Sequence, residues 1–307
     1  MQLFMQQLVN GIVLGATYGL VALGYTMVYG IVQLINFAHG EIFMLGAFGA
    51  LVTYNELVPA GTPAAIAILI MLLGGMVVSV TAAVLMERFA YRPLRGAPRL
   101  APLITALGVS IFLQELVRNF YPATSDKPFP QLVDPSYQVS LGGGVAISAP
   151  SLLTVVAAVI GMVALSSFVR RSRTGRAMQA TAQDPDTARL MGINTDRIIV
   201  IAFMLGAALA AVSGLSYGLQ FGSVAPRMGA LVGVKAFTAA VLGGIGNISG
   251  AVLGGFLLGI VEVMATQYAP DPFSGGSWAN AWGFVVLILV LVFRPNGLLG
   301  ERVAARA

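Results

Sequence analysis

The sequence predicts an all-α protein, a polytopic bundle of transmembrane helices with eight or nine membrane segments and short cytoplasmic helices. Hydrophobic residues make up 57 % of the 307 residues and charged residues only 9 %, whereas soluble domains carry about 25 % charged residues. The first 86 residues hold only two charged side chains, Glu41 and Glu56. A chain this apolar cannot cover itself with polar surface, so we expect a lipid bilayer around a single membrane domain, residues 1–307.

The candidate spans are apolar stretches, because a helix needs about 20 mostly apolar residues to cross a bilayer. They are residues 4–35, 37–57, 63–85, 100–117, 146–169, 198–219, 228–245, 248–264 and 278–293. The stretch 228–245 carries Lys235, and the first two stretches can be divided in more than one way. Nine spans place the N-terminus outside and eight place it inside, and both alternatives stay open.

The basic residues indicate the orientation. Four arginines lie in residues 88–99, six in residues 170–197 and three in residues 294–306, which is thirteen of the 17 Lys and Arg. Short loops rich in Lys and Arg stay on the cytoplasmic side. We therefore expect these segments and the C-terminal tail, about 294–307, in the cytoplasm, and residues 119–145 outside. The net charge of +5 then reflects topology, and no nucleic-acid partner is expected.

Several classes of chemistry are excluded by what the sequence lacks. The chain has no cysteine, which rules out disulfides, zinc–thiolate sites and thiol catalysis. Its two lysines, Lys127 and Lys235, do not follow glycine, so the phosphate-binding Gly-x4-Gly-Lys-Ser/Thr pattern is missing. No Ser–His–Asp set or paired carboxylates occur in the apolar stretches, and Glu115 and Glu262 are assigned no role. We expect no catalytic residue, bound cofactor or metal site in this chain.

The arginine-rich loop, about residues 170–197, contains a docking pattern. Asp184 is placed to cap a short helix whose first residue is Pro185, where proline is best tolerated. The run from Asp186 to Gly192, Asp-Thr-Ala-x-x-x-Gly, resembles the Glu-Ala-Ala-x-x-x-Gly loop of ABC importer permeases, although Thr187 replaces the middle alanine. In that family the loop docks on an ATPase subunit, which makes these short helices coupling helices. The residues that this resemblance assigns to docking are Asp184, Asp186, Ala188, Arg189 and Gly192. The alternative is an amphipathic helix whose basic residues face lipid headgroups.

A short polar segment separates the first two apolar stretches. Asn36, His39 and Glu41 lie between them, and His39 is the only histidine. Ionisable groups inside a membrane are costly and usually functional, so we predict that these three residues belong to the transport path or gate. A proton relay through His39 and Glu41 is a second interpretation. A polar turn at the membrane surface is the third.

A glycine-rich segment interrupts a later apolar pair. We predict a flexible break between two helices there, because discontinuous helices in matching places often flank a transporter site. The residues of this break are Gly243, Gly244, Gly246, Asn247 and Gly250. Glycines also recur at every fourth position from Gly11 to Gly19, a spacing that favours close packing of helices.

Longer runs extend the resemblance to nearly the whole chain. They are Gly24–Ala47, Glu87–Gly96, Arg173–Gly214 and Lys235–Gly255. These runs resemble LivH-type permease subunits of bacterial high-affinity branched-chain amino acid ABC transporters. The likeness is weakest in residues 119–145.

The resemblance implies the activity and the partners. It implies alternating-access import of branched-chain or related amino acids across the bacterial inner membrane. Expected partners are a second, LivM-like permease, two cytoplasmic ATPase subunits that hold ATP and magnesium, and a periplasmic amino-acid-binding protein. Whether the permease pair is a homodimer or a heterodimer stays open.

Two other functions stay open beside this one. The same permease architecture can carry urea, amides or other amino acids. A carrier or channel that works without an ATPase, coupled to an ion through His39 and Glu41, is the other class.

Overall fold

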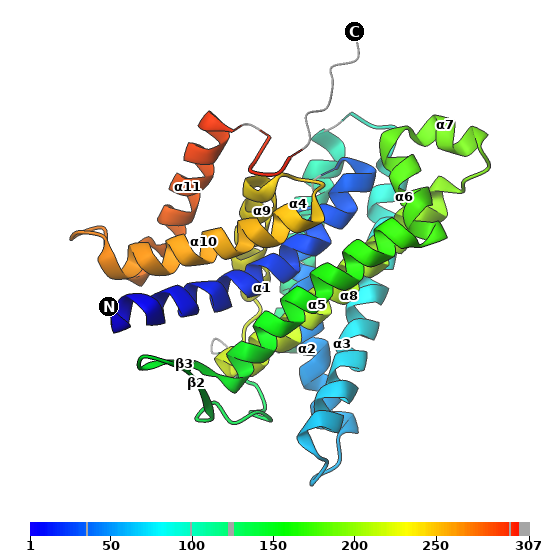
Figure 1. Cartoon of the computed structure of the whole chain (residues 1–307). Helices are drawn as coiled ribbons and strands as arrows, with labels where there is room; N and C mark the ends of the chain where they lie inside the picture. Colours follow the sequence, from blue (N-terminus) through cyan, green and yellow to red (C-terminus); the bar gives the residue numbers. More distant parts are fainter. Residues whose placement is uncertain (35, 99, 122–125, 295, 301–307) are drawn as a thin grey trace.

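The computed structural model describes residues 1–34, 36–98, 100–121, 126–294 and 296–300. Arg99 and the last residues of the expected C-terminal tail, 301–307, lie outside the described residues. The α-helices are α1 (Gln2–Val32), α2 (His39–Leu57), α3 (Ala64–Met86), α4 (Leu100–Phe120), α5 (Ala149–Arg171), α6 (Arg173–Gln183), α7 (Pro185–Leu190), α8 (Thr195–Phe221), α9 (Met228–Gly243), α10 (Ile248–Tyr268) and α11 (Ala279–Phe293) (Figure 1).

Short elements extend or connect these helices. The π-helix η1 (Glu87–Tyr91) and the 3-10 helix η2 (Arg92–Leu94) continue α3, and the 3-10 helix η3 (Gly276–Trp278) precedes α11. The strands are β1 (Lys127–Pro128), β2 (Gln138–Gly142), β3 (Val145–Ser148) and β4 (Ser223–Val224). Strands β2 and β3 form an antiparallel hairpin, and β1 pairs with β4.

The number of candidate spans is lower than the expected eight or nine. Within the described residues, seven helices are long and apolar enough to cross a membrane: α1, α3 with η1 and η2, α4, α5, α8, α10, and α11 with η3. Helix α2 and the 16-residue helix α9 are not among them. The all-helical membrane bundle is therefore confirmed, but the exact count is not.

Helix α2 lies in the centre of the bundle, which explains its lower hydropathy. Fourteen of its 19 residues are buried, against α1, α3, α8 and α9. A helix enclosed by other helices does not need the apolar surface that lipid requires. The outer helices show the opposite pattern, with large exposed apolar side chains such as Leu73, Ile111 and Ile160 on α3, α4 and α5.

Glycine faces bring α1 and α10 into close contact along most of their length, and the two helices run side by side (Figure 1). A Cβ atom on Gly15 would lie 2.6 Å from the carbonyl oxygen of Gly255 and 2.6 Å from the Cα of Phe256. Gly11 meets Ile260 in the same way. The close packing predicted from the glycine spacing is therefore confirmed for this stripe.

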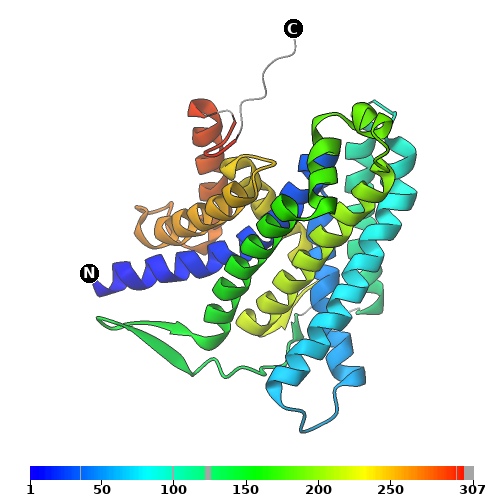
Figure 2. The ribbon, with the colours of Figure 1, turned by 45° about the vertical axis from the view of Figure 1, so that its right-hand side comes forward.

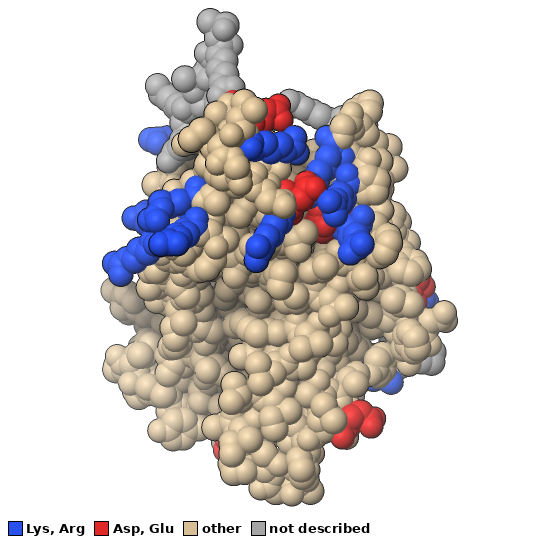
Figure 3. Space-filling view, turned by 90° about the vertical axis from the view of Figure 1, so that its right-hand side faces the viewer, with Lys and Arg blue, Asp and Glu red and all other residues tan. Residues whose placement is uncertain are grey.

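The two ends of the bundle differ in what they carry. Helices α6 and α7 lie at one end, and the β2–β3 hairpin lies at the other (Figures 1 and 2). Basic side chains gather near the α6–α7 end, above a broad band without charge (Figure 3). The exposed arginines of this end include Arg88, Arg92, Arg170, Arg171, Arg173, Arg176, Arg189 and Arg197.

Candidate functional site

The sequence of the arginine-rich loop fixes two short helices at this end. The side chain of Ser172 caps α6 by accepting a hydrogen bond from the Gly175 N–H at 2.8 Å. Asp184 caps α7, because its Oδ1 accepts from the N–H groups of Asp186 and Thr187 at 3.0 and 3.1 Å. Gly192 then turns the chain with a φ of +81°, a conformation that glycine adopts without strain. The predicted cap at Asp184 and the stop at Gly192 are confirmed.

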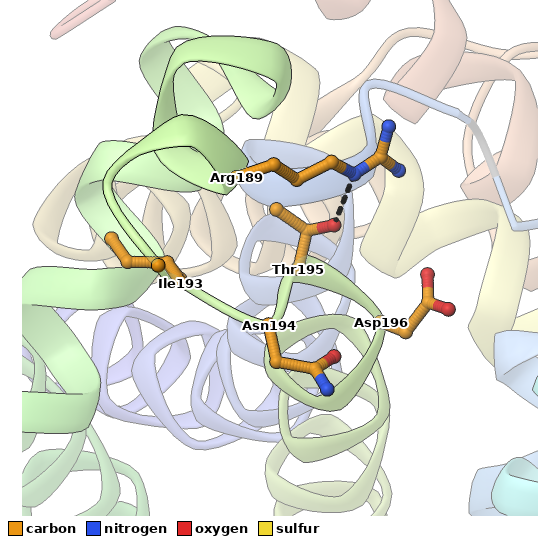
Figure 4. A pocket seen from close by; sticks show the side chains of 6 residues that line it. Arg189, Ile193, Asn194, Thr195 and Asp196 are labelled. Atoms are coloured by element: carbon orange, nitrogen blue, oxygen red, sulfur yellow. Dashed lines mark hydrogen bonds between the residues drawn. The ribbon is translucent and has the colours of Figure 1, made fainter.

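The docking residues named from the sequence occupy different environments. Asp186 and Arg189 are exposed and form an ion pair at 3.2 Å. Arg189 also donates from Nε to the Thr195 hydroxyl at 2.9 Å (Figure 4). Ala188 is only 4 % exposed, so its methyl group packs inside this chain and positions α7. A partner protein would therefore meet α7 through side chains other than Ala188.

Two apolar side chains that the sequence analysis did not single out dominate the exposed tip of α7. Leu190 is 87 % exposed and Met191 is 78 % exposed. Beside them the surface between α7 and α8 is hollowed by about 420 Å³, lined by Arg189, Gly192, Ile193, Asn194, Thr195 and Asp196 (Figure 4). An exposed apolar pair next to a hollow is typical of a protein-binding surface. The sequence signal that could have identified this surface is the presence of two large apolar residues, Leu190 and Met191, within a polar loop.

A charge network fastens this end to the rest of the bundle. Arg95 bonds both to Glu87, which is 1 % exposed, and to Asp196 at the start of α8. Arg92 pairs with the same Asp196 at 2.8 Å but is half-exposed. The network therefore links η1 and η2 to α8, the helix that follows the α6–α7 loop. Spacing in the sequence gave no sign of it.

Replacing Arg95 by methionine is expected to destabilise the protein by about 3–5 kcal/mol, because Glu87 would stay buried without its cation. The matched change Arg92→Met removes an exposed partner of the same Asp196 and should cost about 1 kcal/mol or less. Thermal unfolding of the detergent-purified variants measures both. Equal losses for the two variants would contradict the buried role of Arg95.

The polar group at residues 36–41 is buried inside the bundle. Asn36, His39 and Glu41 are at most 3 % exposed. The Asn36 Oδ1 accepts from the Tyr91 hydroxyl at 2.8 Å, and the Glu41 Oε1 accepts from Ser110 at 3.1 Å. Helix α1 ends before this group and α2 begins within it, at His39. This burial argues against a water-exposed turn.

Three polar atoms of this group lack a hydrogen-bond partner among the described residues. They are the Asn36 Nδ2, the His39 Nε2 and the Glu41 Oε2. Glycines make the space for two of them, since a Cβ on Gly24 would collide with His39 and one on Gly229 with Glu41. Buried polar groups are normally bonded, so unpaired atoms gathered at a helix break indicate a functional role or a bound solvent molecule.

The glycine-rich segment lies in a different environment from this polar group. Gly244 and Gly246 have φ angles of +104° and +98°, which form the turn between α9 and α10. Asn247 caps α10 by accepting from the Gly250 N–H at 2.9 Å, and its Nδ2 donates to the Leu299 carbonyl at 2.9 Å. The N–H of Leu299 donates to the Gly243 carbonyl at 3.0 Å. The break predicted from the sequence exists, and residues 298–299 hold it through hydrogen bonds.

The last polar group is an ionic cluster between α1, α9 and α10. Lys235 bonds to Glu262 at 2.6 Å and to the Tyr18 hydroxyl at 3.1 Å. The Tyr18 hydroxyl also donates to the Glu262 Oε2 at 3.1 Å. No role for Glu262 was predicted from the sequence. The sequence does contain a signal for this pair, because Lys235 and Glu262 are opposite charges in two neighbouring apolar stretches.

The architecture is a helical membrane bundle with two short helices, α6 and α7, at its basic end. A solved inward-facing structure assigned to the metal-chelate type of ABC transporter shares the fold, with a TM-score of 0.51 and 14 % identity, covering 95 % of this chain and 88 % of that one. The chain belongs to the family of branched-chain amino acid transport system permease components, whose model matches residues 7–294. Members of this family are transporter subunits and not enzymes.

Close relatives agree with the family. The chain is 45 % identical to the high-affinity branched-chain amino acid transport system permease protein BraD of Pseudomonas aeruginosa, over 97 % of this chain and 96 % of that protein. It is 42 % identical to the corresponding permease LivH of Escherichia coli K12, with the same coverage of both chains. The resemblance to LivH-type permeases found in the sequence is therefore confirmed.

Proposed function

We propose that this chain is a permease subunit of an ATP-driven importer and forms part of the membrane path for branched-chain amino acids by alternating access. The observation that carries the proposal is the identity of 45 % to such a permease over 97 % of the chain. The exposed Leu190 and Met191 at the tip of α7 supply a docking surface that fits the proposal. A permanently bound cofactor is not part of it, and ATP with magnesium belongs to the partner ATPase subunits.

The proposed assembly contains three kinds of partner. Two ATPase subunits dock at the α6–α7 loop, a second, LivM-like permease completes the path, and a periplasmic binding protein delivers the amino acid. The pairing is what the resemblance to ABC importer permeases implies, in which the permease works with a second, related permease. Co-purification from a tagged copy of this chain, followed by identification of the bound subunits, tests this composition.

Transport by the assembly decides between the open functions. Vesicles that contain the full complex should accumulate labelled leucine only when ATP is enclosed with the ATPase subunits. Uptake by this chain alone, driven by an ion gradient, would instead establish an ion-coupled carrier. Uptake of urea or amides in place of leucine would assign the related substrate class.

We also propose a topology of nine crossings, in the bacterial inner membrane, with the N-terminus outside and the C-terminus in the cytoplasm. The side chain of Gln6 donates to the Ala146 carbonyl at 2.9 Å, which ties the start of α1 to the β2–β3 hairpin, at the end opposite the arginines. The central helix α2 and the short helix α9 then count as crossings that are shielded by their neighbours. A reporter that is active only outside the cell, fused to the N-terminus, tests the orientation.

The change His39→Ala is expected to lower leucine uptake by about tenfold or more without lowering membrane abundance. The proposal places Asn36, His39 and Glu41 in the path or gate, and the unpaired His39 Nε2 is available to a substrate, a water or a moving partner. A lost hydrogen bond to such a group corresponds to roughly this factor. The measurement is the initial rate of uptake, normalised to the amount of complex.

The matched control for His39 is Thr53→Ala in the same helix. The Thr53 hydroxyl is buried and donates to the Gly49 carbonyl of its own helix at 2.7 Å, so its loss should leave uptake nearly unchanged. Unchanged uptake in both variants would remove His39 from the path and leave it as a packing residue.

A further inference from the structure

The ionic cluster of Tyr18, Lys235 and Glu262 has no part in the proposed docking or in the polar group around His39. It is closed on itself by three hydrogen bonds of 2.6–3.1 Å. The Lys235 and Glu262 side chains keep 20 % and 8 % of their surface accessible. The cluster is therefore largely enclosed, yet it can be reached from one side.

Such a cluster is costly in a membrane protein. Charged side chains within transmembrane helices are rare, and they usually mark a path for a substrate or ion. Replacing a buried ion pair by apolar residues of similar size is often neutral or stabilising. Stability therefore does not require Lys235 and Glu262 in α9 and α10. A role in binding is the alternative explanation for this ion pair.

The cluster opens onto a cavity of about 270 Å³ between α1, α8, α9, α10 and α11. Apolar and aromatic side chains form much of its wall, including Leu14, Tyr217, Phe221, Leu231 and Val232. Thr17 also lines the cavity, and its hydroxyl is buried without a hydrogen-bond partner among the described residues. Pockets for drug-sized ligands measure roughly 300–1,000 Å³, so this cavity suits a smaller molecule.

We propose that this cavity is a subsite for the zwitterion of an aliphatic α-amino acid, an inference that rests on the function proposed above. The α-ammonium group of the ligand binds Glu262, and its α-carboxylate accepts hydrogen bonds from Lys235 and the Tyr18 hydroxyl. The aliphatic side chain packs against Leu231 and Val232. Each charge of the opened ion pair receives a counter-charge from the ligand, so binding leaves no net charge buried.

Protection from thiol labelling tests the subsite directly in the complete transporter. The chain has no cysteine, so a single Leu231→Cys variant is labelled at one position in this subunit. Leu231 lines the cavity and is 58 % exposed. Leu253→Cys is the matched control, because Leu253 on α10 is 50 % exposed and lies outside the cavity lining.

The probes are L-leucine, 3-methylbutylamine and 4-methylpentanoate, which carry both charges, only the positive charge and only the negative charge. We expect leucine to slow labelling of Leu231→Cys severalfold, while the two singly charged analogues protect little and Leu253→Cys reacts equally throughout. Equal labelling of Leu231→Cys with and without leucine would overturn the subsite. Equal protection by all three probes would do the same.

The double variant Lys235→Met with Glu262→Met separates binding from packing. It removes both charges together, so a purely structural pair predicts normal abundance and near-normal uptake. The subsite predicts normal abundance, uptake lowered about 10–100-fold and loss of protection by leucine, because the charge-assisted hydrogen bonds are gone. Near-normal uptake would overturn the subsite.

A second variant and the unmodified transporter complete the test. If the double variant fails to accumulate, Lys235→Gln with Glu262→Gln keeps hydrogen-bonding groups at both positions and still removes both charges together, and the same outcomes apply to it. Failure of the unmodified complex to import any amino acid would overturn the proposed function. Import of leucine by the unmodified complex, without protection of Leu231→Cys, would overturn only the subsite.

Discussion

Replacing both Leu190 and Met191 by aspartate is expected to lower ATP-driven uptake by at least about 30-fold while the chain remains in the membrane. These side chains are 87 % and 78 % exposed and contribute little to the fold of this chain. At a docking surface, a central apolar side chain is often worth about 2 kcal/mol or more, which corresponds to about 30-fold in affinity. Charged replacements add the cost of burying carboxylates in the interface.

The measurement pairs uptake with the recovery of ATPase subunits on a tagged permease. Both should fall together, because loss of docking removes the source of motion and leaves the path intact. Leu141→Asp is the control, since Leu141 is 57 % exposed in the β2–β3 hairpin at the opposite end. Normal ATPase recovery by the α7 variant would place the docking surface elsewhere, and a matching loss in Leu141→Asp would point to general damage.

The second large effect concerns the contact between α1 and α10. Gly259→Ala is expected to destabilise the protein by about 1–3 kcal/mol or more, because overpacking forces well-packed elements apart. The added methyl group would collide with the backbone of Gly11 and Gly15. A backbone cannot rotate away as a side chain can, so the two helices must separate.

Gly108→Ala in α4 is the matched control for this change. Nothing lies within 4 Å of a Cβ at Gly108, so the same substitution should be neutral or stabilise the helix by up to about 1 kcal/mol. The measurement is the melting temperature of each detergent-purified variant, at which half of the protein is unfolded. A Gly259→Ala protein as stable as Gly108→Ala would show that α1 and α10 can part without cost.

Local features of the chain were readable in the sequence because local chemistry determines them. Asp184 followed by Pro185 predicts a capped helix start wherever it occurs, and Gly192 predicts its end. The glycine spacing of α1 predicts a close helix contact, although not its partner. The membrane location follows from composition alone.

Contacts across the chain were not readable, because apolar stretches look alike in sequence. Helix α2 is central in the bundle and is not apolar enough to be a candidate span, and its position depends on how α8 and α9 pack. The meeting of Lys235 with Tyr18 depends on the same packing. Likewise, the sequence pattern predicts docking through Ala188, whereas this residue is buried and Leu190 and Met191 form the exposed tip.

The central position of α2 also sets a condition on how the protein is made. This helix carries His39 and Glu41 among its first residues and is not apolar enough to be a candidate span by itself. Its partners α8 and α9 begin only at Thr195 and Met228. During synthesis, therefore, α2 is made well before the two helices that help to bury it. We infer that α2 enters the bilayer together with its neighbours, and that chains cut short before α8 expose these groups to lipid and to membrane proteases.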